Sequence, residues 1–260
     1  MDPLLERHIA RCNNAVLPGN RLPFLIGCQL VGWVKPQMAD ALAAYDAIVR
    51  GPDRVTLKET MAGDLPAIAE GLADRALFRF RHEEFDVRAD PEGDVLARVD
   101  RGALPQLGIM SVGVHLNGLV RRADGIHVWV GHRAMDKPLD PGKLDQIVAG
   151  GVPAGMTPEE TLTKEAEEEA GMSAALVANA RHVARVTYAH ERAEGLRRDL
   201  LHCYDIDLPD NFMPHSNDGE VDRFELWPIG RVYETVRDTD QVKFNVNLVL
   251  IDLFQRLGMA

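Results

Sequence analysis

The chain has 260 residues, and its 29 basic and 40 acidic side chains give a formal net charge of −11. A surface this acidic repels nucleic-acid backbones, which excludes DNA and RNA polymers as partners. No apolar run approaches the roughly 20 residues that a membrane-spanning helix needs, and the first residues lack the apolar core of a signal peptide. We therefore expect a cytoplasmic protein that does not contact membranes. The three cysteines form no CxxC pair and favour free thiols over disulfides or a zinc site.

Short strands and helices are predicted for the first hundred residues. Two strands are expected on either side of Gly27, where apolar and β-branched residues cluster. Apolar residues at helical spacing predict one helix over 38–49 and another over 64–75. A further strand is expected over 78–90, before a turn rich in Asp, Pro and Gly. This part of the chain carries no recognisable chemical motif.

From Gly108 onward, the pattern changes to longer strands joined by turns. The sequence Ala-Asp-Gly at 123–125 separates two β-rich runs, which is a strong hairpin signal. Three later strands and two final helices are expected over 180–190, 200–208, 223–229, 232–236 and 245–256. We place a domain boundary near residue 105, so that 1–105 form a smaller α/β domain and 106–260 form a second domain.

The segment from Gly150 to Met172 carries the clearest chemical signal. A glycine-rich loop is followed by Thr157, which can cap a helix, and by Pro158, which fits the first helical position. Gly171 is suited to the left-handed conformation that ends many helices. The sequence therefore predicts a short helix with a defined start and a defined end.

Three carboxylates share one face of this helix. Glu165, Glu168 and Glu169 stand at positions i, i+3 and i+4 and project within one turn. Their repulsion would be removed by a divalent cation, and oxygen ligands suit Mg²⁺ or Mn²⁺. Gly150 lets the backbone approach closely, so its carbonyl is expected to complete the metal site. A Glu cluster alone is more often a solvated surface, but the ordered combination of loop, cap, three Glu and final Gly favours a metal site.

The same segment resembles the Nudix box, GX5EX7REUXEEXGU, in which U is an apolar residue. Residues 164–172, KEAEEEAGM, match its second half and put Glu165, Glu168 and Glu169 on the three metal-binding positions. The resemblance implies a Nudix fold, an α+β or α-β-α sandwich, for the C-terminal domain. It also implies a Mg²⁺-dependent hydrolase that acts on phosphoanhydride bonds.

Two positions depart from the box. The first Glu of the box falls on Met156, and its Arg falls on Lys164. In the family these two side chains tend to pair with each other and support the geometry of loop and helix. Lys164 can instead bridge Glu160 or Glu168, four residues away on either side. The resemblance therefore implies that the loop is held differently in this chain.

The resemblance extends over most of the sequence. VGVHLNGLV, PGKLDQIVAGG, NDGEV and FNVNLVLIDLFQR are similar to two-domain Nudix proteins related to part of some fungal thiamine pyrophosphokinases. In that subgroup an uncharacterised N-terminal domain precedes the Nudix domain. Its members are associated with hydrolysis of thiamine diphosphate and its oxidised or damaged analogues. The resemblance thus implies a small-molecule diphosphate as substrate, whereas the spacing of residues specifies no thiazolium ring.

Attack of water on phosphorus needs a general base, and the phosphates need cations. Glu168 or Glu169 could activate the water while binding metal. Glu220 in the loop NDGEV is the alternative base, because Nudix enzymes often draw a further Glu from a later loop. Arg133 and Lys143 flank the loop before the box and are the candidates for phosphate contacts, although scattered cations are more often solvated.

Other hypotheses remain open at this point. The substrate could be a nucleoside diphosphate linked to a sugar or coenzyme, because the box handles only the diphosphate. Met156 in place of Glu would suit a weakly active Nudix-fold binding module, against which stands the intact Glu triplet. An isoprenoid diphosphate isomerase also uses this fold, but no cysteine is placed to be its acid–base partner. The N-terminal domain could cover the pocket, contact substrate or build a homodimer, and fold analogy does not decide.

Overall fold

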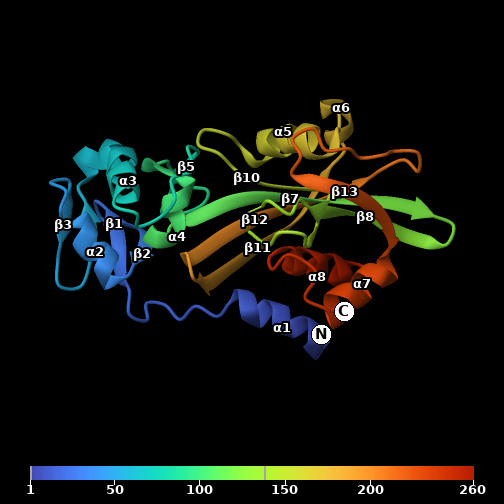
Figure 1. Cartoon of the computed structure of the whole chain (residues 1–260), viewed down its shortest axis with the longest axis horizontal. Coiled ribbons are helices and arrows are strands. Elements are labelled where there is room, and N and C mark those ends of the chain that lie inside the picture. Colours follow the sequence, from blue (N-terminus) through green and yellow to red (C-terminus); the bar gives the residue numbers. More distant parts are fainter. Residues whose placement is uncertain (1, 138) are drawn as a thin grey trace.

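The computed structural model describes residues 2–137 and 139–260, which form a smaller and a larger unit (Figure 1). The strands of the smaller unit are β1 (Leu22–Ile26), β2 (Gln29–Val34), β3 (Ile48–Arg50), β4 (Val55–Leu57), β5 (Glu84–Val87) and β6 (Ala97–Asp100). The first four make one sheet in the order β2-β1-β4-β3, and β5 and β6 make a separate antiparallel pair. Its helices are α2 (Pro36–Leu42), α3 (Leu65–Asp74) and α4 (Leu104–Leu107), with 3-10 turns at Glu59–Asp64 and Arg101–Ala103.

The larger unit is a mixed sheet between two layers of helices. Its strands are β7 (Met110–Arg122), β8 (Gly125–Arg133), β9 (Leu144–Asp145), β10 (Val148–Gly151), β11 (Arg181–Arg192), β12 (Gly195–Asp207) and β13 (Val221–Pro228). They run in the order β11-β12-β7-β8-β13, with β10 beside β7 and β9 beside β8. Helices α5 (Pro158–Ala170) and α6 (Ala174–Val177) cover one face, and α7 (Ile229–Asp238) and α8 (Val246–Arg256) cover the other (Figure 1). The predicted α+β class and α-β-α sandwich are confirmed.

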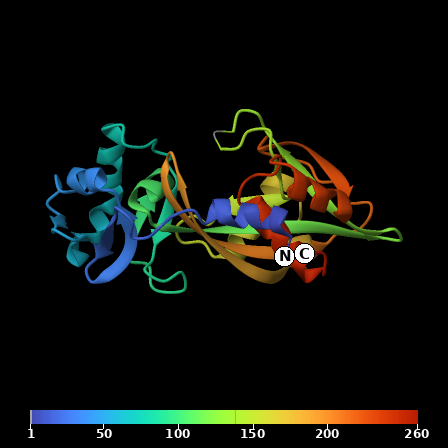
Figure 2. The same ribbon diagram turned by 90° about the horizontal axis from the view of Figure 1, so that it is seen from below.

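The first helix, α1 (Pro3–Cys12), lies against the larger unit rather than the smaller one. Figure 2 shows it beside the C-terminal helices. Leu5 is fully buried in the apolar core that contains Val236 and Phe254, and Nε2 of His8 lies 2.7 Å from the carbonyl oxygen of Val236. The apolar core of the smaller unit, in turn, extends to Ile109. The boundary near residue 105 stays a prediction, because the chain crosses between the two cores more than once.

Most elements form where the sequence predicts them, and two are shorter. The strands that flank Gly27, the helix over 64–75 and the later hairpin with its turn at 123–125 are confirmed. The helix predicted over 38–49 ends early as α2, because the residues of β3 pair with β4 instead of continuing the helix. The strand predicted over 78–90 is confined to β5, since only those residues pair with β6.

A row of buried polar side chains lies between the sheet and α8. Nδ1 of His115 donates to the side-chain oxygen of Gln146, whose amide donates in turn to Asn117 over 2.9 Å. Asn117 donates to Asp205 over 2.9 Å, and Arg256 of α8 completes the row with a 2.5 Å hydrogen bond to the same carboxylate. Buried polar groups of this kind are stable only when they are hydrogen-bonded. The row therefore fixes the position of α8 on the sheet.

The buried His115 makes the fold sensitive to acid. Burial, and to a lesser degree Lys243, lower the pKa of its imidazole from 6.5 to about 4. Between these two values the unfolded chain binds a proton that the folded chain does not, so stability is complete above pH 6.5 and is lost as the pH falls toward 4. We expect this residue to lower the free energy of unfolding by about 2 kcal/mol at pH 5 relative to pH 8.

Urea denaturation at the two pH values measures this loss. The variant His115→Gln keeps a side chain that can hydrogen-bond to Gln146 but cannot titrate in this range. We expect the acid-induced loss of stability to shrink by about 2 kcal/mol in the variant. An equal loss in both proteins would assign the acid sensitivity to other groups.

Candidate active site

The helix that carries the Glu triplet is α5, and both of its ends form as predicted. The hydroxyl of Thr157 accepts a 3.1 Å hydrogen bond from the backbone N–H of Glu160, and the carboxylate of Glu160 accepts a 2.8 Å bond from the N–H of Thr157. This reciprocal capping box fixes the first turn. Gly171 ends the helix with a φ of +63°. The face of α5 that meets the sheet is therefore set by local sequence.

Two members of the triplet face strand β10, and the third lies at the rim. Glu169 is 6% exposed and accepts a 2.7 Å hydrogen bond from the backbone N–H of Ala149. Glu165 lies over Gly150 so closely that a Cβ at that position would be 2.5 Å from its Cγ. Glu168 is half exposed and forms a 2.6 Å ion pair with Lys164. The structure thus brings two carboxylates together at the outer edge of the sheet.

These buried carboxylates have perturbed protonation. Burial is the largest cause that raises the pKa of Glu169 well above its usual range, and Asp145, Glu165 and Glu220 raise it further. Burial also raises the pKa of Glu165, although the adjacent Lys164 opposes this. Buried, like-charged oxygen ligands with few donors are stabilised in their charged form by a divalent cation. The donor set fits Mg²⁺ or Mn²⁺, and binding of either ion must release protons.

A later loop brings further carboxylates to the same place. Glu169, Asp218 and Glu220 each offer an oxygen, and these three atoms lie within 4.8 Å of one another. The loop is fixed to the end of α5 by Asn217, whose backbone N–H donates to the carbonyl of Glu168 over 2.8 Å. Glu220 is a residue that the sequence predicts for the site, whereas Asp218, two residues earlier in the same acidic turn, is an addition from the structure.

The pairing of β10 bears on which backbone oxygen faces the carboxylates, which was predicted to be that of Gly150. In an antiparallel ladder, alternate residues direct both backbone groups toward the partner strand. The N–H of Val152 donates to the carbonyl of Val112 over 2.9 Å. Because every second residue has the same orientation, the N–H and C=O of Gly150, two residues earlier, also point toward β7. The backbone N–H of Ala149 points away from β7, because it donates to Glu169 instead. Gly150 therefore provides space for Glu165, and Ala149 directs its carbonyl to the free edge.

Of the predicted phosphate contacts, Arg133 ends strand β8 and Lys143 lies in the loop that follows. Arg133 is largely buried, and its guanidinium donates to Asp145 over 2.7 Å and to the carbonyl of Leu139 over 3.0 Å. The side chain of Lys143 is half-buried and forms no ion pair within the part of the chain that the structure describes. Lys137 is a cation that the sequence analysis missed, and it lies 2.5 Å from the carboxylate of Glu220. No spacing rule distinguishes it from other lysines in the sequence.

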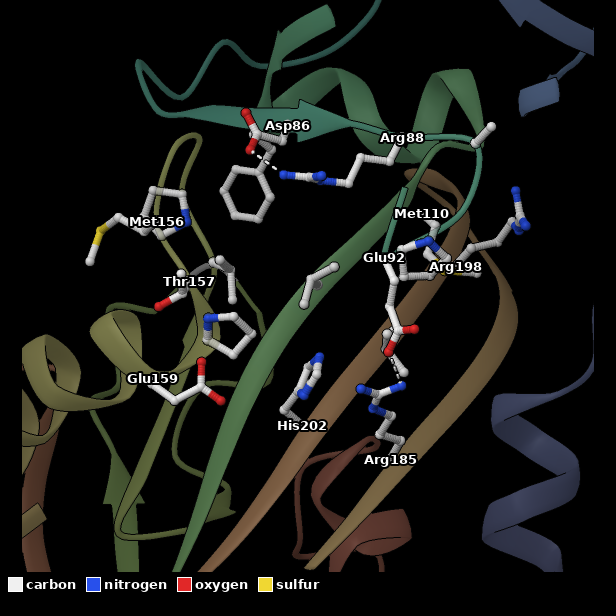
Figure 3. Close-up of a pocket in the computed structure, with 18 of the residues that line it drawn as sticks. Asp86, Arg88, Glu92, Met110, Met156, Thr157, Glu159, Arg185, Arg198 and His202 are labelled. Carbon is white, nitrogen blue, oxygen red and sulfur yellow. Dashed lines mark hydrogen bonds and ion pairs between the residues drawn. The ribbon is translucent and has the colours of Figure 1, made fainter. Parts of the chain in front are cut away.

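A separate cavity of about 360 Å³ lies between the two units, at the start of α5 (Figure 3). Its lining is mainly apolar and includes Phe85, Met156 and Leu200, with Arg198 and His202 among the polar groups. None of the Glu triplet lines it. The cavity opens at the start of α5, roughly 18 Å along the helix from Glu169 at a rise of about 1.5 Å per residue.

The close approach of Gly150 to α5 leads to a prediction. In Gly150→Ala the new methyl group would occupy the position of the Glu165 side chain, which must then move away from its neighbours. We expect the affinity for Mn²⁺, measured by isothermal titration calorimetry, to fall by about tenfold or more. Gly230→Ala is the matched control, because a Cβ at Gly230 has no neighbour within 4 Å. Equal affinities in the two variants would contradict the assignment of Glu165 to the metal site.

Comparisons with known proteins agree with this geometry. A family model described as NUDIX domain matches residues 113–246, and one described as a domain of unknown function (DUF4743) matches residues 5–111. The chain therefore belongs to the Nudix hydrolases and carries a second domain ahead of the Nudix domain, which makes it an enzyme that hydrolyses phosphoanhydride bonds.

Two plant proteins and one solved structure illustrate the relationship. Nudix hydrolase 20, chloroplastic, from Arabidopsis thaliana is 35% identical over 268 residues, which cover 96% of this chain and 72% of that protein. Nudix hydrolase 24, chloroplastic, from the same plant is 34% identical over 262 residues, with the same coverage. The crystal structure of DR0079 from Deinococcus radiodurans covers 67% of this chain and 98% of its own, with a TM-score of 0.50 and 21% identity, which shows the fold alone.

The subcellular location of the protein stays a prediction. Both plant relatives are named as chloroplastic, whereas the sequence analysis expected the cytoplasm. Within residues 2–137 and 139–260, no helix combines the length and the apolar character that are needed to cross a membrane.

Proposed function

We propose that this Nudix hydrolase uses Mg²⁺ or Mn²⁺ to cleave a small-molecule diphosphate to the monophosphate. The observation that carries the proposal is the convergence of Glu169, Asp218 and Glu220 beside β10, with the buried Glu169 at its centre and Glu165 packed over the neighbouring Gly150. A buried carboxylate beside several like charges is costly, and a divalent cation would offset that cost.

The residues of the cluster take different roles in this proposal. A bound Mg²⁺ would neutralise phosphate charge and lower the pKa of a water molecule. Glu165 and Glu169 would hold the ion, because they are the most buried carboxylates of the group, and the carbonyl of Ala149 would complete the site. Glu168 and Glu220 lie at the solvent-exposed rim, where either could accept the proton of the attacking water. Each must first be released from a lysine, Lys164 or Lys137 respectively.

The nearby cations divide into two groups. Lys137 and Lys143 lie between β8 and β9; Lys143 could contact substrate phosphates directly, and Lys137 could do so once its ion pair with Glu220 opens. Arg133 was a candidate for the same role, but its guanidinium is already bonded to Asp145 and Leu139. We assign Arg133 to positioning this loop.

The organic part of the substrate is proposed from the sequence resemblance described above. It favours thiamine diphosphate or its oxidised analogues, and the alternative is a nucleoside diphosphate linked to a sugar or coenzyme. The test is phosphate release from thiamine diphosphate, an oxidised thiamine diphosphate, ADP-ribose and a dNTP, with Mg²⁺ and with EDTA, beside Glu168→Gln.

Each outcome of this assay has a defined meaning. Metal-dependent monophosphate production that is fastest on the thiamine compounds and lost in the variant supports the whole proposal. Turnover of a nucleotide alone keeps the metal mechanism and discards the thiamine substrate. Clean Mg²⁺ binding without turnover of any compound would instead favour a binding module and make Met156→Glu the next variant to test.

A further inference from the structure

We propose that the β5–β6 hairpin of the smaller unit positions the loop over 151–156, which leads into α5 of the Nudix domain. Phe85 and Asp86 are the positioning residues. This inference rests on the proposed metal site, because the loop over 151–156 joins the strand of Ala149 and Gly150 to helix α5. It assigns to the N-terminal domain a direct role in the reaction of its neighbour.

Two backbone amides of the loop are held by the hairpin and not by the Nudix domain itself. The N–H of Ala154 donates to the carbonyl of Glu84 over 2.8 Å, and the N–H of Gly155 donates to the carboxylate of Asp86 over 3.2 Å. A hydrogen bond to a charged acceptor contributes more than one between neutral groups. The loop is therefore fixed at its centre by contacts from the other domain.

Phe85 fixes the start of the same loop. Its side chain is 3% exposed, and a Cβ on Gly151 would lie only 2.6 Å from its Cζ, so the ring packs directly on the glycine backbone. Arg101 stacks over the ring at 5.6 Å from its centroid. Gly151 immediately follows Gly150, which lies under Glu165. A shift of Phe85 would thus reach the carboxylate site through two consecutive glycines.

Asp86 is itself held in a fixed orientation. Figure 3 shows its carboxylate beside Arg88, from which it is separated by 3.2 Å, and a second arginine, Arg98, lies 3.5 Å away. The side chain is 12% exposed, so these ion pairs are partly shielded from water. The hairpin therefore presents a rigid acceptor to the amide of Gly155.

The hairpin accounts for the two departures from the Nudix box. The positions that would carry a Glu–Arg pair between loop and helix hold Met156 and Lys164, and Lys164 pairs with Glu165 and Glu168 on its own helix. Met156 lines the cavity between the units instead of contacting α5 through an ion pair. The contact that holds the loop has thus moved from the helix to the hairpin.

The test uses the full-length protein and two readouts, amide hydrogen exchange over 151–156 and Mn²⁺ affinity by titration calorimetry. Asp86→Ala is expected to speed exchange at Gly155 by about tenfold or more, which corresponds to about 1.4 kcal/mol, and to weaken Mn²⁺ binding. Asp94→Ala removes the same charge from an exposed site on the β5–β6 connection. Within the described residues, Asp94 makes no ion pair, so this control should match the wild type.

Restoring the box provides the decisive comparison. In the Asp86→Ala background, Met156→Glu together with Lys164→Arg should recover slow exchange and most of the Mn²⁺ affinity, which a merely structural role of Asp86 would not predict. Phe85→Leu gives an independent test should Asp86→Ala fold poorly. The inference is overturned when exchange at 151–156 in both hairpin variants equals that of Asp94→Ala. A wild-type protein that binds no Mn²⁺ would overturn the proposed metal site, while exchange still reports on the hairpin.

Discussion

Replacing Glu169 by glutamine is expected to reduce metal-dependent hydrolysis by about a thousandfold and to stabilise the metal-free protein. The amide keeps an oxygen that can accept the hydrogen bond from Ala149, so the fold should survive. The variant loses the charge that would hold the cation. A bound cation contributes several kcal/mol to catalysis in metal-assisted hydrolysis. It also loses the repulsion from Glu165 and Glu220. We therefore expect a gain of about 1 kcal/mol in the free energy of unfolding without metal.

The pH dependence of thermal unfolding in EDTA gives a second check on Glu169. Burial, the largest cause, raises the pKa of Glu169 in the folded chain. The folded state therefore binds a proton that the unfolded state releases, and stability falls as the pH rises above about 4.5. Glu169→Gln should remove this loss. Glu167→Gln, an exposed neighbour on α5, should keep both the pH dependence and an activity within about twofold of wild type. Wild-type activity in Glu169→Gln would exclude Glu169 from the metal site.

Asp145→Asn should destabilise the protein by about 3–5 kcal/mol, because it leaves two buried cations without a counter-ion. The carboxylate of Asp145 lies 2.7 Å from the guanidinium of Arg133 and 3.0 Å from the ammonium of Lys243. Burial alone would raise its pKa, but Lys243 and Arg133 outweigh burial and hold the pKa below its usual range. The three charges therefore form one unit whose stability depends on all its members.

Urea denaturation of Asp145→Asn beside Asp210→Asn measures this effect. Asp210 forms a 2.6 Å ion pair with Arg122, but both side chains are solvent-exposed. Exposed pairs contribute about 0–1 kcal/mol, so the control should change little. Similar losses in the two variants would show that burial of the Asp145 cluster carries no special cost. Loss of Mn²⁺ binding in a folded Asp145→Asn protein would further indicate that Arg133 positions the loop beside the carboxylates.

The helix of the candidate site could be predicted from the sequence, because its start, its end and its acidic face are each determined by neighbouring residues. The cap at Thr157, the final Gly171 and the shared face of the Glu triplet depend only on residues within a few positions of each other. In the smaller unit, the residues at which helices and strands begin and end depend instead on contacts with residues that are distant in sequence. The strand predicted over 78–90 does not begin before β5, because the carboxylate of Asp100, distant in sequence, accepts hydrogen bonds from the backbone N–H groups of Arg81 and Glu83.

The backbone oxygen of the metal site depends on strand pairing for a related reason, and its assignment to Gly150 or Ala149 stays a prediction. The sequence shows that a glycine stands near the carboxylates, but only the ladder determines which residue of β10 directs its carbonyl outward. The hydrogen bond between Val152 and Val112 determines which carbonyls of β10 point outward, and no local sequence pattern predicts that pairing. Lys137 and Asp218 were missed because their relevance depends on two loops, far apart in sequence, that meet at the end of α5.

Because α1 docks on the larger unit, the chain contacts that unit both before and after the smaller one. The chain begins on the Nudix sandwich, leaves it to build the smaller unit, and returns at β7. A fragment that starts at residue 106 would lack Leu5 and His8 and would expose apolar surface of α7 and α8 to water. A fragment meant to keep the Nudix sandwich intact therefore has to include α1 as well as residues 106–260.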